Sequence, residues 1–499
     1  MSLFKRFFVG AGYGLAGSVV QRILLAAGAI VYARLLGVQD YGIWVNLAAL
    51  VNVLMTVSQF GVNTAFAAFI PQYRSQAPER IPSVVASGIA FVVGMLLVMT
   101  AVLLEGAEMI STAAYHGALR PEHVRIAAPY LVGITLNSVL LAALYGFQDF
   151  RRYSLQTMLA ALLTICCSVP GVLLGGVRGL ALGMAFAYLV SCVIVGRALW
   201  SHHSGWLQVT RGAVTRTQRE LIRFALPTFL GGLFVAPAYW IGNLILVREH
   251  GIAASGFFGV ANALAQLVLF LPSTIASPLI PILSEVAAEG NRERLSGFVV
   301  RNLRMMWCVS VPVSVLFGGA APVLITVLYG RAYEPSSTTY VILAASNLLI
   351  ALQSVVGFVL IAKRKMWQGL MANALWFCLF IAFGLWLIPA AGHRGFALSF
   401  LLSYAVYGVV VLAILRKHVD FTLRLGDSIL NGGLTVLAMG VMIGLAVSVT
   451  TPLLNALLAS ICAAGFAAAA WRWVLQDDDR VLVRHTISQY VAKVKSQIG

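Results

Sequence analysis

The chain has 499 residues, of which 60% are hydrophobic and only 10% are charged, whereas an ordinary soluble domain carries roughly 25% charged residues. So little charge could not cover the surface of a soluble protein, which excludes a soluble enzyme, a nucleic-acid-binding protein and a disordered scaffold. Long apolar runs also exclude an outer-membrane barrel, whose strands alternate between apolar and polar residues. The remaining class is an all-α polytopic membrane protein, in which a net charge of +17 first reflects orientation in the bilayer.

Breaks in hydropathy at glycine, proline and charged residues predict about fourteen spans of about 20 apolar residues or more. The first span follows Lys5 and Arg6, and its apolar stretch is too long for a signal peptide, which favours an uncleaved helix. In chain order the predicted spans are 11–33, 41–70, 83–104, 127–147, 155–175, 179–199, 222–246, 253–284, 300–327, 338–361, 366–389, 395–415, 428–449 and 452–473.

The distribution of Lys and Arg predicts the orientation of these spans. With the N-terminus inside, 26 of the 34 Lys and Arg fall in inner segments, seven fall in outer loops, and Arg22 alone lies within a span. Because inner segments of membrane proteins are enriched in Lys and Arg, this bias favours an even number of spans with both termini cytoplasmic.

An internal repeat divides the chain. A shift of 214 residues aligns 33–42 with 247–256, and a shift of 216 aligns 177–183 with 393–399. The aligned pairs are Arg34 with Arg248, Gly37 with Gly251, Gly42 with Gly256 and Asn52 with Gln266. Two six-span halves inserted in the same sense are a transporter architecture with its site at the repeat interface. The predicted parts are an N-lobe (1–200), a basic linker (201–221), a C-lobe (222–415), an extra helix pair (416–474) and a tail (475–499).

Arg22 is the most informative single residue, because it lies near the middle of the first predicted span, beside Gln21. An arginine at that depth costs about 3 kcal/mol or more unless it faces a cavity or a partner. It could snorkel or donate to carbonyls of a neighbouring helix, but a cation facing a cavity is favoured. Since the fork of guanidinium donors matches the geometry of phosphate, an anionic substrate is expected.

Polar residues form stripes on two predicted spans. Spacings of four, three and four residues place the first stripe on one helical face of the second span. The second stripe shares a face of the eighth span. The first stripe consists of Asn52, Thr56, Gln59 and Asn63, and the second consists of Asn262, Gln266, Ser273 and Ser277. Hydrogen bonding between helices is the alternative, but two repeat-related stripes favour two walls of one hydrated substrate vestibule.

The eighth span also contains Pro272, Pro278 and Pro281. Each removes a backbone donor and can kink the helix, so the three are candidate hinges for a helix that bends between two states. Proline is also common in membrane helices without such a role, and the sequence leaves both interpretations open.

Arg34 and Arg248 form an outer pair that the repeat relates, and Arg178 and Arg394 form another. They are candidates to bind an anionic headgroup or lipid phosphates. The favoured interpretation is structural, because an arginine beside glycine at the end of a span often anchors a turn. In the loop at 148–154, Asp149 is likewise expected to form an ion pair in the turn.

The sequence contains no motif for catalysis or metal binding. Its six cysteines lie in apolar runs without metal-ligand spacing and are interpreted as small buried hydrophobic residues. No Asp, Glu or His lies in the middle of a predicted span, so no proton relay is expected. The motifs of ATPases, hydrolases and zinc enzymes do not occur. The sequence therefore predicts a protein that is not an enzyme and that needs neither a cofactor nor a metal.

Five short motifs occur in order along nearly the whole chain, at 33–44, 59–66, 144–150 (LeuTyrGlyPheGlnAspPhe), 256–264 and 328–333 (LeuTyrGlyArgAlaTyr). Together they resemble the polysaccharide transporter family, the Wzx-type flippases of O-antigen and exopolysaccharide repeat units. This family belongs to the superfamily of multidrug, oligosaccharidyl-lipid and polysaccharide exporters.

The resemblance implies a protein of the bacterial inner membrane with both termini in the cytoplasm. Such a protein moves an undecaprenyl-pyrophosphate-linked oligosaccharide from the cytoplasmic to the outer leaflet, by alternating access of two lobes. The implied site lies between the lobes on spans 1, 2, 7 and 8, which include Arg22 and the polar stripes. The implied partners are this lipid-linked substrate, membrane lipids, a polysaccharide polymerase and a chain-length regulator, and no nucleic acid.

Four alternatives stay open. Lipid II flippases of the same superfamily also have an arginine in the first span, so lipid II is a competing substrate. A multidrug exporter typically has an acidic residue there, and its absence argues against that branch. A membrane glycan polymerase or ligase needs a sizeable outer loop, and the outer loops are short. The fourth alternative is a non-catalytic scaffold of a polysaccharide assembly complex.

Overall fold

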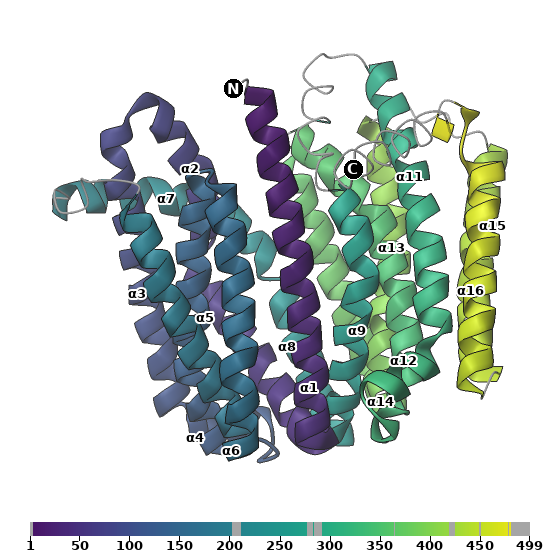
Figure 1. Cartoon of the computed structure of the whole chain (residues 1–499), viewed down its shortest axis with the longest axis horizontal. Coiled ribbons are helices and arrows are strands. Elements are labelled where there is room, and N and C mark those ends of the chain that lie inside the picture. The colour runs from purple at the N-terminus through teal and green to yellow at the C-terminus, as the bar shows by residue number, and fades with distance from the viewer. Residues whose placement is uncertain are drawn as a thin grey trace, which may run out of the picture. The chain divides into compact units, whose positions relative to one another are not determined.

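The computed structural model describes residues 3–201, 211–276, 283, 292–363, 365–418, 425–448, 451–477 and 479–480. Over these ranges the chain is almost wholly helical, and no strand occurs among them (Figure 1). This confirms the all-α class. A helix suits the apolar composition because it pairs its backbone groups within one segment, which a bilayer demands.

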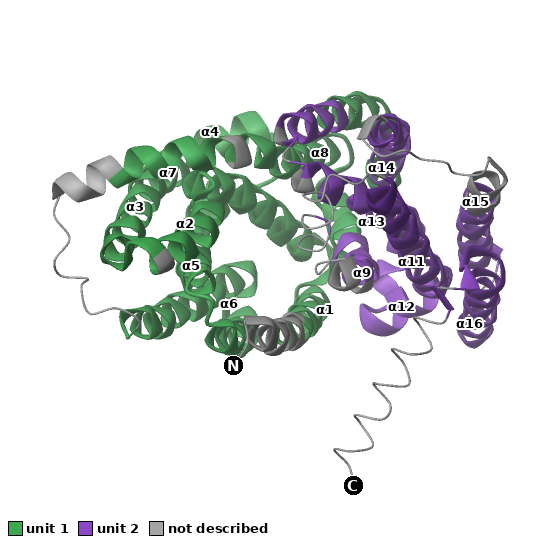
Figure 2. Ribbon diagram, turned by 90° about the horizontal axis from the view of Figure 1, so that it is seen from above, with its two compact units in different colours: residues 1–260, 377–396 green, residues 261–376, 397–499 purple. Residues whose placement is uncertain are grey.

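The chain divides into two compact units, residues 1–260 with 377–396 and residues 261–376 with 397–499 (Figure 2). The helices of the first unit are α1 (Leu3–Gln59), α2 (Val62–Gln76), α3 (Ile81–Glu105), α4 (Ala107–Met109), α5 (Pro121–Gly146), α6 (Phe150–Trp200), α7 (Arg211–Gly232) and α8 (Val235–His250), with a 3-10 turn at Pro78–Arg80 and a π-helix at Ile110–Ala114. The predicted five-part division stays a prediction.

The second unit contains α11 (Arg292–Gly319), α12 (Ala321–Leu328), α13 (Ser336–Ala362), α15 (Leu425–Ser448) and α16 (Pro452–Ala469), with a 3-10 turn at Arg331–Tyr333 and a π-helix at Ala470–Val474. Two helices contribute to both units, α9 (Ile252–Ala276) and α14 (Met366–His418).

Among the described residues, ten helices are long and apolar enough to cross a membrane, and the apolar segment Gly432–Ser448 is shorter. Three of the ten, within α1, α6 and α14, each cover two predicted spans and change direction at glycines whose backbone is not helical. The protein is therefore a multi-pass membrane protein, while the number of fourteen spans stays a prediction.

Glycines at positive φ mark the bends, and they have the same conformation at positions that the repeat aligns. Gly37 has φ 72° and ψ 177°, and Gly251 has φ 78° and ψ 172°. Gly176 has φ 55° and ψ −133°, and Gly392 has φ 58° and ψ −133°. Only glycine adopts such angles without a steric cost. The two sequence offsets therefore correspond to matching local structure at these bends.

Just after the first of these bends, α1 crosses α9 within the first unit at a pair of glycines. A Cβ on Gly42 would meet the carbonyl oxygen of Ile252, and a Cβ on Gly256 would meet that of Val38. The repeat aligns Val38 with Ile252 as well as Gly42 with Gly256, so the contact is reciprocal. Small residues let two membrane helices approach this closely.

Three predicted spans are interrupted in the structure. The second is broken at Phe60 and Gly61, which have φ 44° and 76°, and its remainder forms α2. The seventh divides into α7 and α8 after Gly232, and the ninth divides into α11 and α12 at Ala320. The flanking residues are apolar, so hydropathy gave no sign of these breaks.

The cysteines differ from the prediction. All six are free thiols, but Cys166 and Cys378 are exposed on their helices instead of buried. A small apolar side chain is as well tolerated on the outer surface of a membrane helix as in its core, so an apolar run by itself does not predict burial.

A buried carboxylate holds the end of the second unit together. Asp479 is 1% exposed, and its two oxygens lie 3.0 Å from Nε of Arg301 and 2.9 Å from Nη2 of Arg304, both on α11. The next residue, Arg480, donates from Nε to the carbonyl of Trp471 at 2.9 Å. These contacts fix the segment that follows the last apolar helix against α11.

We predict that Gly42→Ala and Gly256→Ala each destabilise the protein by about 1–3 kcal/mol, because the new methyl group would meet backbone atoms that cannot turn aside. Thermal unfolding of the purified protein in detergent measures the effect. Gly94→Ala is the matched control, since Gly94 lies in α3 and a Cβ there would have no neighbour within 4 Å. Equal stability of Gly42→Ala and the wild type would contradict the close crossing.

We predict that Asp479→Asn lowers the free energy of unfolding by about 3 kcal/mol or more, because it leaves two arginines without their buried counter-charge. Asp477→Asn is the control, since the Asp477 side chain is 91% exposed. Melting temperatures of the two variants should differ clearly. A similar melting temperature for both would show that the buried pair does not hold this end of the chain.

Candidate functional site

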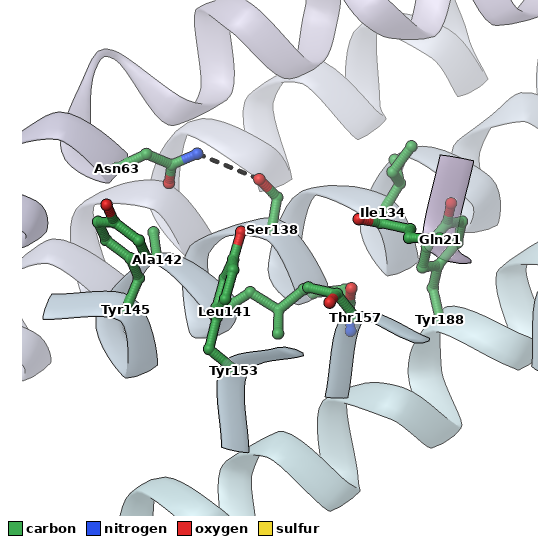
Figure 3. A pocket seen from close by; sticks show the side chains of 11 residues that line it. Gln21, Asn63, Ile134, Ser138, Leu141, Ala142, Tyr145, Tyr153, Thr157 and Tyr188 are labelled. Atoms are coloured by element: carbon green, nitrogen blue, oxygen red, sulfur yellow. Dashed lines mark hydrogen bonds between the residues drawn. The ribbon is translucent and has the colours of Figure 1, made fainter. Parts of the chain in front are cut away.

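A cavity of about 400 Å³ lies inside the first unit, between α1, α2, α5 and α6 (Figure 3). Eleven residues line it, and none of them is charged. They are Gln21, Asn63, Ile134, Asn137, Ser138, Leu141, Ala142, Tyr145, Tyr153, Thr157 and Tyr188. Amides, hydroxyls and aromatic rings on an otherwise apolar wall are typical of a site for a small neutral polar group.

The connection between α5 and α6 positions one end of this cavity. Asp149 caps α6 by accepting from the backbone N–H of Arg152 at 3.1 Å, and its carboxylate also pairs with the Arg152 guanidinium at 3.4 Å. The expected turn ion pair is therefore present. Arg74, at the end of α2, donates to the carbonyl of Phe147 in the same connection. These bonds hold the last turn of α5 beside the first turn of α6.

Two tyrosines face each other across that connection. The rings of Tyr145 and Tyr153, the tyrosine pair, meet edge to face with their centroids 5.2 Å apart and their planes at 68°. Tyr145 is 44% exposed although it belongs to an apolar helix. The pair thus presents aromatic surface to the cavity, as Figure 3 shows.

The break at Phe60 and Gly61 brings two residues of the first polar stripe together. Asn63 Nδ2 donates to Oε1 of Gln59 at 2.9 Å and to Oγ of Ser138 at 3.1 Å (Figure 3). The sequence predicted one face of one helix, which is wrong for Asn63, because α1 ends at Gln59 and Asn63 belongs to α2. Gln59 and Asn63 are called the amide pair below.

The amide pair keeps unused hydrogen-bonding capacity. Oδ1 of Asn63 and Nε2 of Gln59 are buried, and neither has a hydrogen-bond partner among the described protein atoms. A buried polar atom without a partner costs about 1–3 kcal/mol. Asn63 lines the cavity, whereas Gln59 is not among the lining residues, so only Asn63 can reach a ligand there, by turning its amide.

Other polar groups at the cavity have partners. Asn137 is buried and donates from Nδ2 to Oγ of Ser191 at 2.7 Å, and Thr157 donates to the carbonyl of Ser154 at 2.9 Å. The first bond joins α5 to α6, and the second lies within α6. Rigid walls around a few available polar atoms favour recognition of one ligand geometry.

The structure places the other residues predicted for the first two spans near this cavity but not in its lining. Arg22 is exposed on α1 and directly follows Gln21, which lines the cavity. Asn52 is exposed, and Thr56 donates its hydroxyl to the carbonyl of Asn52 at 2.8 Å, within its own helix. Threonine often bonds to its own helix in this way, so Thr56 has a local structural role.

The residues predicted for the eighth span belong to α9 in the second unit. Asn262 is half-buried and Gln266 is exposed. Pro272 is buried within α9, which continues past it to Ala276. Pro278 and Pro281 lie outside the described residues. The roles of these residues in substrate binding and bending stay predictions.

The outer arginines make structural contacts. Arg248 donates from Nε to the carbonyl of Ala114 at 2.9 Å and from Nη2 to that of Ala113 at 2.6 Å. It thereby caps the π-helix in the loop before α5, which is the anchoring role that the sequence favoured. Arg178 pairs with Glu122. Arg34 is exposed, and binding of an anionic headgroup by Arg34 or Arg248 stays a prediction.

Sequence reasoning missed most of the cavity lining, including Asn137, Ser138 and all three tyrosines. Tyrosine and serine are ordinary in apolar helices, so they did not stand out individually. One signal was present, because Tyr145 belongs to the motif at 144–150 and Tyr153 lies three residues after its end.

A second cavity, of about 380 Å³, lies in the second unit between α11, α13, α14 and α15. Its walls are mainly Leu and Val. The polar groups on them are few: Arg304, which is bound to Asp479, and Trp307, whose Nε1 donates to Oγ1 of Thr435 at 2.8 Å, are two of them. The two cavities therefore have contrasting chemistry, one polar and uncharged, the other apolar.

The fold places the chain in the class of multi-pass α-helical membrane proteins. Its polar, uncharged cavity lies within one of the two units. The chain belongs to the family described as polysaccharide biosynthesis protein, whose model matches residues 31–338.

Individual proteins agree with this membership. The chain is 22% identical over 382 residues to the lipid III flippase of Escherichia coli strain K12, which covers 74% of this chain and 89% of that protein. It is 24% identical over 437 residues to the EPS I polysaccharide export inner membrane protein EpsE of Ralstonia nicotianae, covering 85% and 96%. These are names of transport proteins, in line with the prediction that the chain is not an enzyme.

The fold is shared with a solved structure. The inward closed conformation of the lipid II flippase MurJ matches with a TM-score of 0.72 at 14% identity, and the match covers 92% of this chain and 98% of that one. At this level of identity the likeness establishes the fold.

We predict that Arg248→Ala lowers the melting temperature, because the carbonyls of Ala113 and Ala114 lose their charged donor, a loss of about 1–3 kcal/mol. Arg125→Ala is the control, since Arg125 is half-exposed and lies 3.5 Å from its partner Glu108. Unchanged stability combined with reduced transport would instead favour a role of Arg248 in binding substrate.

Proposed function

We propose that the protein is a flippase for lipid-linked saccharides, and that its substrate is an undecaprenyl-pyrophosphate-linked oligosaccharide repeat unit. It moves this unit from the cytoplasmic to the outer leaflet of the bacterial inner membrane, for assembly of O-antigen, exopolysaccharide or capsule. Membership of the polysaccharide biosynthesis family and the similarity to a lipid III flippase and an export protein support the class.

The observation that carries the proposal is the uncharged polar cavity beside Arg22. A lipid-linked oligosaccharide combines neutral sugars, an anionic pyrophosphate and a long hydrocarbon chain. The cavity offers amides and aromatic rings for sugars, and Arg22 on the adjoining position of α1 offers a guanidinium for phosphate.

The mechanism in this proposal is alternating access, with both termini cytoplasmic as the distribution of Lys and Arg favours. A polysaccharide polymerase that consumes the translocated unit and a chain-length regulator are the proposed protein partners. Outward movement of the substrate then needs no chemical step in this chain, because the sugar–lipid bond stays intact.

Lipid II is the second candidate substrate, since the matching fold of MurJ belongs to a lipid II flippase. Both substrates have a pyrophosphate and a long prenyl chain, so Arg22 does not distinguish them. Rescue of cells depleted of their own lipid II flippase would favour lipid II. Failure to rescue, with surface polymer restored in cells that lack this protein's gene, favours the repeat unit.

We predict that Arg22→Ala lowers the amount of surface polymer about tenfold or more at equal protein level, because a charged fork on phosphate is lost. Arg22→Lys should retain part of the export, since lysine keeps the charge but not the fork. Arg151→Ala is the control, an exposed arginine at the start of α6. Normal export by Arg22→Ala would remove Arg22 from the substrate site.

A further inference from the structure

We propose that the cavity of the first unit is a subsite for one neutral sugar residue of the substrate, bound by Asn63 and the tyrosine pair. This inference rests on the proposed function, because the sugar arrives attached to a lipid. It adds a place within the site and a chemical basis for recognising the glycan.

Asn63, the member of the amide pair that lines the cavity, favours a hydroxyl as the ligand group, because a side-chain amide both donates and accepts. Asn63 Nδ2 is already used twice, which leaves one acceptor, Oδ1 of Asn63, and one donor, Nε2 of Gln59. Exchanging oxygen and nitrogen in both amides again leaves one acceptor and one donor. A hydroxyl also donates and accepts, so it can bond to the Asn63 amide when that amide turns from Gln59 toward the cavity.

Charged ligand groups match only one of these two hydrogen-bonding capacities, the donor or the acceptor. An ionised phosphate accepts and does not donate, and an ammonium group donates and does not accept. Either group would also lose its hydration among eleven uncharged lining residues. Both unused atoms are covered in this structure, so binding turns the amide of Asn63 toward the cavity that its side chain borders.

The tyrosine pair supplies the second half of the recognition. One face of a pyranose ring carries C–H groups and packs on an aromatic face, while its hydroxyls point outward to polar partners. Tyr145 and Tyr153 stand at 68° to each other, so they offer aromatic surfaces in two directions. In Figure 3 they lie on the same side of the cavity as Asn63.

The volume and the neighbouring charge fit the same assignment. About 400 Å³ lies within the range of roughly 300–1,000 Å³ of small-molecule sites, which suits a sugar residue and not a long polymer. Gln21 lines the cavity and Arg22 follows it on α1. A sugar in the cavity therefore lies close to a cation that can hold the pyrophosphate to which it is linked.

The test compares two lipids on the purified full-length protein in nanodiscs. One is the lipid-linked oligosaccharide extracted from the cells that make this protein, and the other is undecaprenyl pyrophosphate without sugar. Asn63→Ala and Tyr153→Ala should each weaken binding of the sugar-bearing lipid about tenfold and leave binding of the sugar-free lipid unchanged. Arg22→Ala should weaken binding of both lipids.

Trp367→Ala is the matched control, because the repeat aligns Trp367 with Tyr153, and Trp367 is 68% exposed on α14. It should bind both lipids as the wild type does. Tyr153→Phe keeps the ring and removes only the hydroxyl, so it should retain most of the affinity and reports on folding independently of Tyr153→Ala.

Equal weakening of both lipids by Asn63→Ala and Tyr153→Ala, or no weakening of either, would overturn the sugar subsite. So would a loss for Tyr153→Phe as large as that for Tyr153→Ala. Failure of the proposed function looks different, because the wild type then binds neither lipid and restores no surface polymer.

Discussion

A bilayer offers no water to backbone groups, so each reversal of a spanning helix must keep its N–H and C=O groups paired within a few residues. Glycine at positive φ meets this constraint at Gly37, Gly176, Gly251 and Gly392. At Gly251, for example, the backbone N–H still donates to the carbonyl of Val247 at 2.9 Å. These bends fold α1, α6 and α14 in two, and the close crossing at Gly42 and Gly256 depends on the first of them.

The bends also determine where polar side chains lie. Folding α6 at Gly176 brings Tyr188 on its second half into the same cavity as Tyr153 on its first. Asn63 lies just after a different break, at Phe60 and Gly61, and still donates to Gln59. The cavity therefore joins side chains from both sides of helix interruptions.

Hydropathy predicted the helical class for a physical reason, whereas the two-lobe repeat stays a prediction. Apolar runs of membrane length can only be helices, and the shifts of 214 and 216 residues found the glycines that share one conformation. The breaks at Gly61 and after Gly232 were not predictable, because glycine also occurs inside continuous membrane helices. The tyrosines were missed because an aromatic residue in an apolar helix usually packs in the core or faces lipid.

Substrate binding by the predicted site residues stays a prediction, but the structure places several of them at informative positions. Gln21 and Asn63 do line the cavity, and Arg248 does anchor a turn, since polar groups in apolar helices must find a use. The many basic residues say less about the substrate than the net charge suggested. Arg74, Arg152 and Arg304 all bind groups of the protein itself. Arg22 stays the cation that we propose for the phosphate of the substrate.

The central claim is that this chain moves an intact lipid-linked saccharide between leaflets. The most direct measurement uses liposomes with the purified protein and a fluorescent lipid-linked oligosaccharide, and follows the fraction that a membrane-impermeant quencher reaches. The account predicts that the protein speeds exchange between leaflets over protein-free liposomes and that the extracted lipid is chemically unchanged. Exchange no faster than without protein, or a lipid whose sugar has been transferred or cleaved, would contradict it.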